Sequence, residues 1–302
     1  MEDIAKFYKI TPQQEYERNP KLSENDVQEL LKWANDNINV NGKLTDIQII
    51  MFLHACNYDR ENAKKVISQY FTLRAKKCAI YFRGRDPTHP FNQKQFDVVN
   101  INILEDEVER YSYIWTSLKI GDASQYYPNV AAKLTFMAIE LKQVEKGTMP
   151  GYRILIDSRK FGLSHALRYS LSNAKNLMTY VQEATPFIIE QIYIINVTPG
   201  IERIYSTMKP FMSAALINKI VIKSVSKTEE LLKSLPQHVV PKDFGGQAPT
   251  LQESMDKLRA EMIENREFFL AEERYRNGVV QSEVETITPD EEIQSFKSLS
   301  ID

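Results

Sequence analysis

The stretch from residue 185 to residue 212 constrains the fold more than any other part of the chain. Its first half, residues 188–197, is short, rich in β-branched side chains and bounded by Pro186 and by Pro199-Gly200. A segment of this kind is typical of a β-strand whose two faces are both buried. We therefore expect a strand in the interior of a sheet here.

The second half of this stretch changes from a strand pattern to a helical one. Its apolar residues are spaced at i, i+3, i+4 and i+7, which places them on one face of a helix; they are Ile201, Ile204, Tyr205 and Met208. Pro210 ends the pattern, because proline lacks the backbone N–H that a helix interior needs. We interpret the strand as the floor of an apolar cavity and the helix as its lid.

Size, charge and cysteine content exclude several classes of protein. The chain has 302 residues, and its 38 Lys+Arg against 40 Asp+Glu give a formal charge of −2, so no overall basic field attracts nucleic acid and we expect no such partner. Cys56 and Cys78 are too few for a disulfide scaffold. No apolar run approaches the roughly 18 residues of a membrane-spanning helix, and no signal peptide is recognisable. We expect a cytoplasmic protein that meets membranes only peripherally.

The first part of the chain predicts helices and no strands. Ser23 can cap a helix that runs to Asn37, a second helix covers Ile47 to Ala55, and Asp59 can cap a longer helix that continues to about residue 80. The Gly- and Pro-containing segment 84–90 ends this pattern. We therefore predict an all-helical N-terminal subdomain over residues 1–90.

From residue 91 onward, helix and strand patterns alternate. After a polar connector, the predicted elements are strands at 111–121, 152–156, 188–197 and 219–222 and helices at 129–144, 164–181, 201–209, 213–218 and 250–276. This alternation favours an α/β fold with a largely parallel sheet flanked by helices. We predict this domain over residues 91–276, with 250–276 as its closing helix, and a disordered acidic tail over residues 277–302.

Motifs for enzyme or metal chemistry are missing, with one exception. The sequence has no HExxH, P-loop, GxGxxG or paired CxxC motif, and its histidines stand singly, so we expect no metal site and no cofactor. Gly162-Leu-Ser164-His-Ala166 is close to the nucleophile elbow of hydrolases. Ser164 comes too far after the strand that ends near residue 156, and we expect it to cap the next helix instead. A lipid esterase that uses Ser164 is therefore a minor alternative, and no catalytic residue is predicted.

The apolar residues alone do not decide between a cavity and a solid core. Family resemblance favours the cavity. The segments that carry it are GYRILID (151–157), FGLSHAL (161–167), IYIINVTPGIERIYSTMKPFMS (192–213) and the stretch from Leu235 to Gly246, preceded by MFLHACNYDRENAKKVISQYFTLR (51–74). This ordered series, over about residues 22–251, resembles the CRAL-TRIO lipid-binding family. The resemblance implies a cage of strands and helices that encloses one apolar ligand under a mobile helix, without covalent chemistry.

By position, the resemblance implies a set of residues that line the cavity and its lid. The walls would be formed by Thr135, Phe136, Ile139, Ile154, Ile156, Leu177, Tyr180, Val181, Phe187, Ile189, Ile192 and Ile194, and the lid by Ile201, Ile204, Tyr205, Met208, Phe211 and Met212. Among them, Thr135, Tyr180 and Tyr205 would be the polar groups that hold a ligand hydroxyl. The ligand would be alpha-tocopherol or a similar lipid, or a retinoid.

Lysines near the lid are candidates for a membrane contact. Lys209, Lys219 and Lys223 lie close together in the sequence and could bind acidic lipid headgroups. An ordinary solvated face is the slightly preferred interpretation of these lysines.

One departure from the family concerns phosphoinositides. Relatives that recognise these lipids carry basic residues where this chain has His54, Cys56, Ile188, Glu190 and Ala215, although Lys219 is retained. These differences argue against phosphoinositide-triggered release.

The leading hypothesis is an intracellular carrier that takes one hydrophobic lipid from a membrane, encloses it and delivers it to another membrane through the mobile lid. The rival is a protein-interaction scaffold with a filled core, which would bind its partner through the C-terminal helix or the acidic tail.

Overall fold

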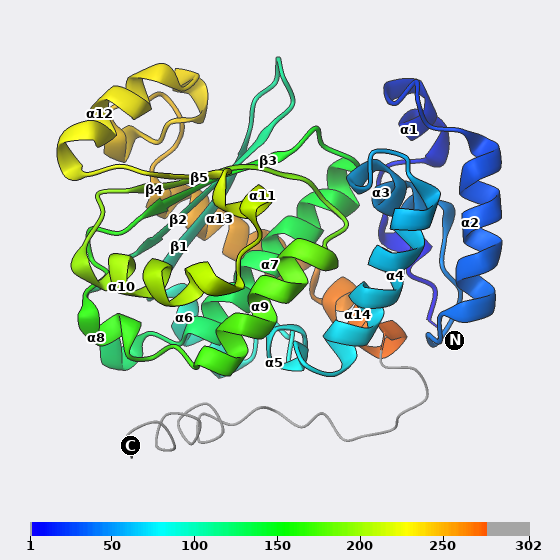
Figure 1. Cartoon of the computed structure of the whole chain (residues 1–302), viewed down its shortest axis with the longest axis horizontal. Coiled ribbons are helices and arrows are strands. Elements are labelled where there is room, and N and C mark those ends of the chain that lie inside the picture. Colours follow the sequence, from blue (N-terminus) through cyan, green and yellow to red (C-terminus); the bar gives the residue numbers. More distant parts are fainter. Residues whose placement is uncertain (1, 277–302) are drawn as a thin grey trace.

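The structure is a computed structural model that describes residues 2–276 of the chain. It consists of a five-stranded sheet with helices on both faces, beside a group of helices from the N-terminal part (Figure 1). The expected class, a largely parallel α/β sheet preceded by helices, is confirmed. The acidic tail predicted over residues 277–302 lies outside the described residues.

The N-terminal part is helical, as predicted. Its elements are η1 (Ala5–Phe7), α1 (Pro12–Arg18), α2 (Glu24–Asn37), α3 (Asp46–Ala55), α4 (Arg60–Ala75), α5 (Ala79–Phe82) and α6 (Pro90–Phe96). Ser23 and Asp59 cap α2 and α4, as the sequence indicated. The single helix expected from Asp59 to about residue 80 is wrong, because the chain leaves helical geometry at Lys76. This break lets Cys78 and Phe82 turn into the same core as Leu73.

The sheet has the order β1-β2-β3-β4-β5. Its strands are β1 (Val99–Glu105), β2 (Ser112–Leu118), β3 (Tyr152–Asp157), β4 (Ile189–Ile195) and β5 (Ile220–Ile222). β1 runs antiparallel to β2, and the other pairs are parallel. The polar connector expected after residue 90 is wrong, since this segment contains α6 and β1. The two asparagines of β1 lower its strand propensity, although Val99, Ile101 and Ile103 alternate with them as in a strand.

The helices of the second part follow or separate these strands. They are η2 (Ala123–Gln125), α7 (Pro128–Lys146), α8 (Leu163–Ala166), α9 (Leu171–Glu183), α10 (Pro199–Met208), η3 (Lys209–Phe211), α11 (Ala214–Ile217), α12 (Val225–Ser234), η4 (Gln237–Val239), η5 (Lys242–Phe244), α13 (Leu251–Glu264) and α14 (Arg266–Arg276). The helix predicted over 164–181 is two helices, because Ser170 caps α9 and starts it anew. The closing helix predicted over 250–276 is also two helices, which meet at Asn265.

The two faces of the sheet are covered by different elements. Trp115, Leu155 and Ile195 point to the face that packs against α12 and the segment after it. Ile114, Ile154 and their neighbours on the other face pack against α5, α7 and α9 near the start of the strands. Toward the carboxyl ends of the strands, that second face lies opposite α10 (Figure 1).

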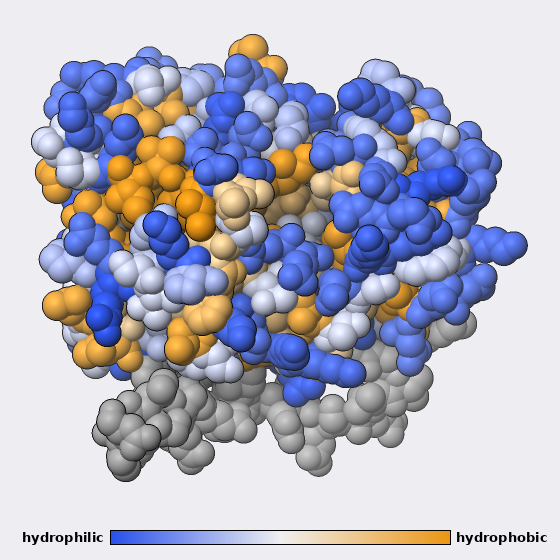
Figure 2. Space-filling view, viewed as in Figure 1, coloured by the Kyte–Doolittle hydropathy of each residue, from blue (hydrophilic) through white to orange (hydrophobic). Residues whose placement is uncertain are grey.

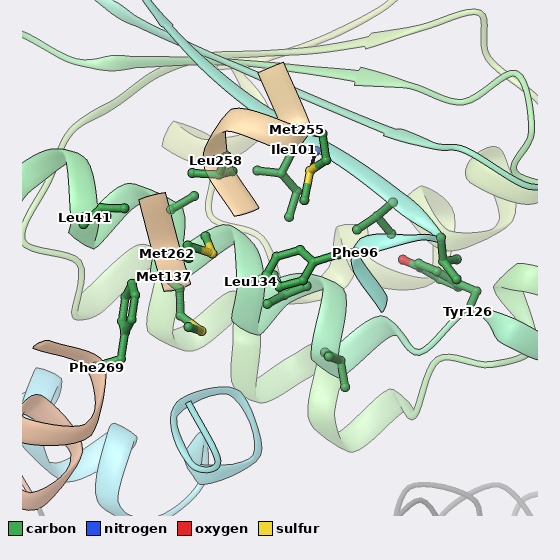
Figure 3. Packing of buried hydrophobic residues seen from close by; sticks show 14 of the residues in the cluster. Phe96, Ile101, Tyr126, Leu134, Met137, Leu141, Met255, Leu258, Met262 and Phe269 are labelled. Carbon is green, nitrogen blue, oxygen red and sulfur yellow. Dashed lines mark hydrogen bonds between the residues drawn. The ribbon is translucent and has the colours of Figure 1, made fainter. Parts of the chain in front are cut away.

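The last two helices complete two cores. Met255, Leu258 and Met262 of α13 pack with Leu134 and other residues of α7 and with β1, as Figure 3 shows. Ala271 and Tyr275 of α14 instead belong to the core of the N-terminal helices. The N-terminal helices therefore do not close their core by themselves.

A buried ion-pair network joins the two parts of the molecule. Arg74 of α4 lies 2.7 Å from Glu140 of α7 and 3.5 Å from Glu272 of α14. Arg85 pairs with both carboxylates, and Arg276 donates from Nε to Glu272 at 3.1 Å. All five side chains are at least nine-tenths buried. Breaking such a network leaves an uncompensated charge in the interior, which costs several kcal/mol.

Candidate ligand-binding cavity

An apolar cavity of about 330 Å³ lies between the carboxyl ends of the strands and α10. Its volume is at the lower end of the range for small-molecule pockets in proteins. The residues that line it come from all five strands and from α7, α9, α10 and the turns near them: Val99, Asn100, Ile101, Thr116, Ser117, Leu118, Tyr126, Pro128, Ala131, Ala132, Thr135, Ile156, Asp157, Ser158, Phe161, Tyr169, Ala174, Leu177, Met178, Val181, Ile192, Ile194, Ile201, Ile204, Tyr205, Met208, Met212, Leu216 and Ile220.

The floor of the cavity is made by alternate residues of neighbouring strands. Ile156 of β3 stands beside Thr116 of β2 and Ile194 of β4 in the sheet register. Because side chains alternate between the two faces of a strand, these three point to the same side. β-Branched residues dominate this floor, which gives the cavity an apolar base.

The helix predicted to be the lid, α10, forms where the sequence predicts it. Thr198 caps it by accepting from the Ile201 N–H, and Pro199 occupies the first turn, where its missing N–H is harmless. Ile201 and Met208 are buried, while Ile204 and Tyr205 are half-buried. The apolar stripe of α10 therefore faces the cavity, in the orientation expected of a lid.

Both ends of α10 are attached to neighbouring elements. At its start, the Thr198 hydroxyl donates to the Phe161 carbonyl at 2.5 Å, and Gly200 touches the Gly162 backbone so closely that a Cβ atom would overlap it. After its end, Gln182 of α9 donates to the Phe211 carbonyl at 3.0 Å and accepts from the Ser213 N–H at 2.6 Å. These few contacts would have to break or shift for the lid to move.

Most of the residues predicted to line the cavity do so. They are Thr135, Ile156, Leu177, Val181, Ile192, Ile194, Ile201, Ile204, Tyr205, Met208 and Met212. The structure brings them together from four separate parts of the sequence. Whether they bind a ligand stays a prediction.

The other predicted residues lie outside this cavity. They are Phe136, Ile139, Ile154, Tyr180, Phe187, Ile189 and Phe211. Phe136 and Ile139 belong to the core that α7 forms with α5 and α9, whereas Thr135, about 100° from Phe136 around the helix, lines the cavity. Ile154 and Ile189 face the same side of the sheet as the floor, but they stand near the start of their strands, where the core is solid.

Several cavity residues were not predicted. Those of β1 were missed because that strand was not recognised, and Tyr126 and Tyr169 were missed because they lie in turns. The alternation of apolar residues over 99–103 was the signal that could have identified the β1 wall.

The three predicted hydroxyl-binding residues have different surroundings. The Tyr180 hydroxyl is buried outside the cavity and accepts from Arg74 Nε at 2.8 Å. Burial raises the pKa of Tyr180, so this phenol stays neutral. Thr135 lines the cavity, but its hydroxyl donates to the Ala131 carbonyl at 2.9 Å. Tyr205 lines the cavity from the lid and is half-buried.

The three candidate headgroup lysines do not form one cluster. Lys209 is exposed at the end of α10, and Lys223 follows β5. Lys219 is partly buried, and its ammonium donates to the Ile189 carbonyl at 2.5 Å.

Lys219 lines a second, polar groove of about 840 Å³ between the N-terminal helices and the α9–β4 connection. Cys56, Ile188, Glu190 and Ala215 line the same groove. The positions that the sequence comparison with phosphoinositide-binding relatives singled out are therefore mostly neighbours in space. Of these neighbours, Lys219 is basic and Glu190 is acidic.

The geometry around Ser164 is not that of a nucleophile elbow. Ser164 is exposed within α8 and does not stand on the turn that leaves β3. The expectation that Ser164 caps the following helix is also wrong, because Gly162 is the N-cap of α8 and Ser170 is that of α9. His165 Nδ1 accepts from the Gly162 N–H at 3.1 Å.

Residues 2–276 contain no group of three or more His, Cys, Asp or Glu side chains that could hold a metal ion. No helix among them is long and apolar enough to cross a bilayer.

Comparison with protein families gives two matches. Residues 103–246 match the family described as CRAL/TRIO domain, and residues 19–91 match the family described as Pinta-like, UBA domain. The first match contains all of the sheet except the start of β1, together with the lid helix.

Similar individual proteins were also found. The chain is 25% identical over 236 residues to "Alpha-tocopherol transfer protein-like" of Mus musculus, across 76% of this chain and 66% of that protein. It is 34% identical over 86 residues to "SEC14 cytosolic factor" of Kluyveromyces lactis, across 26% of this chain and 29% of that protein. It thus spans just under two thirds of the first relative's length and less than a third of the second's. The crystal structure of Sfh5 is similar with a TM-score of 0.45 and 12% identity, across 84% of this chain and 82% of that one.

Proposed function

We propose, because residues 103–246 of the chain belong to the CRAL/TRIO domain family, that the protein carries one hydrophobic lipid in the cavity beneath α10 and transfers it between membranes. The cavity itself is the observation that carries this proposal. Its lining is mostly aliphatic and aromatic, and α10 turns its apolar face toward it, which supports a role of this helix as the lid. The similarity to a tocopherol transfer protein-like relative makes a tocopherol-like lipid the first candidate, followed by a retinoid.

Affinity for such a ligand would come from apolar burial. A lipid of about 20 to 30 heavy atoms, at roughly 0.3 kcal/mol per atom, gains about 6 to 9 kcal/mol, which corresponds to micromolar or sub-micromolar binding. A membrane competes for the same lipid through the same hydrophobic effect. The protein therefore needs shape complementarity and a small number of hydrogen bonds to compete.

Transfer requires contact with a membrane, and the surface beside the lid is suited to it. Leu163, Leu167 and Leu171 lie four residues apart on α8 and at the start of α9, and they are 56%, 78% and 42% exposed. We call these three residues the leucine ridge. α8 packs against α10, so the leucine ridge lies next to the lid. Apolar side chains also gather on the surface between β5 and α10 (Figure 2).

The charge around the leucine ridge favours an anionic bilayer. Lys160, Arg168 and Lys175 occur between residues 160 and 182, a segment without Asp or Glu, whereas the preceding Arg159 is paired with Asp157. Cations beside exposed apolar side chains are typical of peripheral membrane binding. We therefore propose a cytoplasmic protein that docks transiently on membranes through α8 and α10. The polar groove with Lys219 and Glu190 gives no reason to add phosphoinositide control to this proposal.

The test is to identify what the purified protein holds. Native mass spectrometry and solvent extraction of the protein from its own cells should yield a stoichiometric hydrophobic molecule. Thr135→Phe, which fills the cavity, should lose most of it. Thr179→Phe is a matched control, because Thr179 also donates to a carbonyl four residues earlier in its helix but does not line the cavity. A folded wild-type protein that holds no lipid and takes none from vesicles would favour the scaffold with a filled core.

A further inference from the structure

The cavity wall contains a pair of tyrosine hydroxyls whose hydrogen-bonding capacity is not used up. The hydroxyl oxygens of Tyr126 and Tyr169 lie 2.8 Å apart, and either can be the donor. Both residues line the cavity. One hydroxyl proton is shared between them, and the described part of the chain offers no other partner for the second proton or for the remaining lone pairs.

Tyr205 contributes a hydroxyl from α10, and the hydroxyls that the other walls contribute, those of Thr135, Thr116 and Ser158, are bonded to the protein. Thr135 donates to the Ala131 carbonyl, and Thr116 donates to the Leu155 carbonyl at 3.4 Å. Ser158 bonds the carbonyls of Ile195 and Asn196. Their protons are therefore committed to backbone oxygens.

Two more polar residues of the wall, Asn100 and Ser117, bond to each other at 3.0 Å. They oppose each other in the β1–β2 register, one position away from the pair Ile101 and Thr116. Because successive side chains alternate between faces, Asn100 and Ser117 point to the side of the sheet away from the cavity. Their side chains therefore do not compete for a ligand oxygen in the cavity.

The tyrosine pair is held in place by its surroundings. Arg168 Nε donates to the Tyr126 carbonyl at 2.5 Å, and the Tyr126 ring packs against Phe161 and His165, with ring centroids 6.0 and 5.7 Å away. In Figure 3, Tyr126 lies at the end of the packed cluster that is farthest from Phe269. Burial raises the pKa of both phenols, so both hydroxyls stay protonated at neutral pH.

We infer that the Tyr126–Tyr169 hydroxyl pair is the subsite that binds the oxygen of a lipid alcohol or phenol, while the rest of the molecule fills the apolar cavity. This inference rests on the proposed function. A ligand hydroxyl can accept the spare proton of the pair and donate to the free lone pair, so it forms two hydrogen bonds. An ether oxygen can only accept, and a hydrocarbon forms neither bond.

The inference is tested with a matched pair of probes, alpha-tocopherol and its O-methyl ether, which differ at the hydroxyl. Binding to the delipidated full chain is measured by quenching of its intrinsic fluorescence. Since one hydrogen bond in a buried site is worth about 0.5 to 1.5 kcal/mol, we expect the wild-type protein to bind the phenol roughly three- to tenfold more tightly than the ether. Tyr169→Phe and Tyr126→Phe should reduce this ratio to about one.

Tyr152→Phe is the matched control. It also removes a buried tyrosine hydroxyl without a hydrogen-bond partner, but this tyrosine lies in the solid core beside Phe187 and outside the cavity. The phenol-to-ether ratio should stay at its wild-type value in this variant. If Tyr169→Phe does not fold, the phenol-to-ether affinity ratios of the wild-type protein and of Tyr126→Phe still test the inference.

The outcomes separate the inference from the proposed function. Saturable binding of both probes with equal affinity overturns the inference and leaves the carrier intact. An unchanged ratio in both Tyr→Phe variants also overturns it. A failure of the wild-type protein to bind either probe or any extracted cellular lipid overturns the carrier and the inference together.

Discussion

At the scale of single residues, the attachment of the lid depends on a few small contacts. Gly200 of α10 meets the Gly162 backbone, and Gln182 bonds both sides of the turn after the helix. Ile201, next to the first contact, also belongs to the buried cluster that contains Phe161 and Ala166. Adding one carbon atom at the contact between Gly200 and Gly162 should therefore change the position of α10.

We predict that Gly200→Ala loosens the start of the lid. The new Cβ atom would overlap the carbonyl carbon and oxygen of Gly162, so α8 and α10 must separate. Overpacking of this kind costs about 1 to 3 kcal/mol of unfolding free energy, and we expect faster release of a bound fluorescent lipid to vesicles. Urea unfolding and stopped-flow transfer measure the two effects.

Gly121→Ala is the control, since a Cβ atom at that position meets nothing within 4 Å. Equal release rates for Gly200→Ala, Gly121→Ala and the wild-type protein would contradict the role of the Gly200–Gly162 contact.

The residue scale also shows what the sequence could predict of the site. The spacing of the apolar residues in α10 identified its inner face correctly. An amphipathic helix at the protein surface buries its apolar face against the rest of the protein. α7 is apolar on most sides and is buried on most sides, so pattern alone could not tell that Thr135 enters the cavity while Phe136 enters the solid core. The helices that pack against α7, namely α5 and α9, decide which of its side chains enter the solid core. Both are distant from α7 in the sequence.

At the scale of secondary-structure elements, α8 and α10 form one unit at the open side of the sheet. They share the Gly200–Gly162 contact and the hydrogen bond from Thr198 to Phe161. One helix brings the leucine ridge and the other brings the apolar stripe of the lid. The two elements can therefore be tested separately for membrane binding and for transfer.

We predict that Tyr205→Asp slows lipid transfer between vesicles about tenfold or more. Tyr205 is half-buried on the inner face of α10, and a charge there opposes both closure over a lipid and insertion into a bilayer. Its melting temperature should fall by only a few degrees, because the side chain already reaches solvent. Glu202→Gln, on the exposed face of the same helix, should transfer at the wild-type rate. A normal rate in Tyr205→Asp would count against α10 as the lid.

We predict that the double variant Leu163→Ser and Leu167→Ser binds anionic vesicles about five- to thirtyfold more weakly. The estimate assumes that partial insertion of the two side chains contributes about 1 to 2 kcal/mol in total. Vesicle sedimentation gives the partition coefficient directly. Val108→Ser, at an equally exposed apolar residue in the β1–β2 turn, should not change it. If the control weakens binding as much as the double variant does, the leucine ridge is not the docking surface.

The elements themselves were predicted where a single periodicity dominates. β3, β4, α7 and α10 were found within a few residues of their observed bounds. β1 was missed because it lies at the edge of the sheet, and α13 supplies its burial from about 150 residues later in the chain. The alternation over residues 99–103 could have indicated the strand, but not the helix that buries it.

At the scale of the whole molecule, the Arg–Glu network and α14 join the N-terminal helices to the part of the chain that contains the sheet. Three arginines and two glutamates meet between α4, α7 and α14. Burial by itself would raise the pKa of Glu272, but Arg276, Arg85 and Arg74 outweigh it and hold this pKa below its usual value of 4.5. The carboxylate therefore stays ionised in the folded protein at a pH where it is protonated in the unfolded chain.

We predict acid-sensitive stability from this network. Because the folded pKa of Glu272 is depressed, its contribution is fully present above about pH 4.5 and is lost as the pH falls through the folded value. Urea unfolding between pH 7 and pH 3 should show this decline. Glu272→Gln should be about 3 to 5 kcal/mol less stable at pH 7 and should lose less on acidification.

Glu61→Gln, at an exposed residue of α4, is the control and should follow the wild-type curve. Parallel curves for Glu272→Gln and the wild-type protein would contradict the assignment of the acid sensitivity to this carboxylate.

The place of α14 in the N-terminal core has a consequence for biosynthesis. Ile4, Met51 and Phe71 are buried with Ala271 and Tyr275, so the first helices to leave the ribosome cannot shield these side chains until residue 276 has been made. Nascent chains usually fold their N-terminal part first, whereas here the core of that part stays incomplete until α14 has been made. Until then, apolar side chains that α14 covers in the finished protein are open to chaperones.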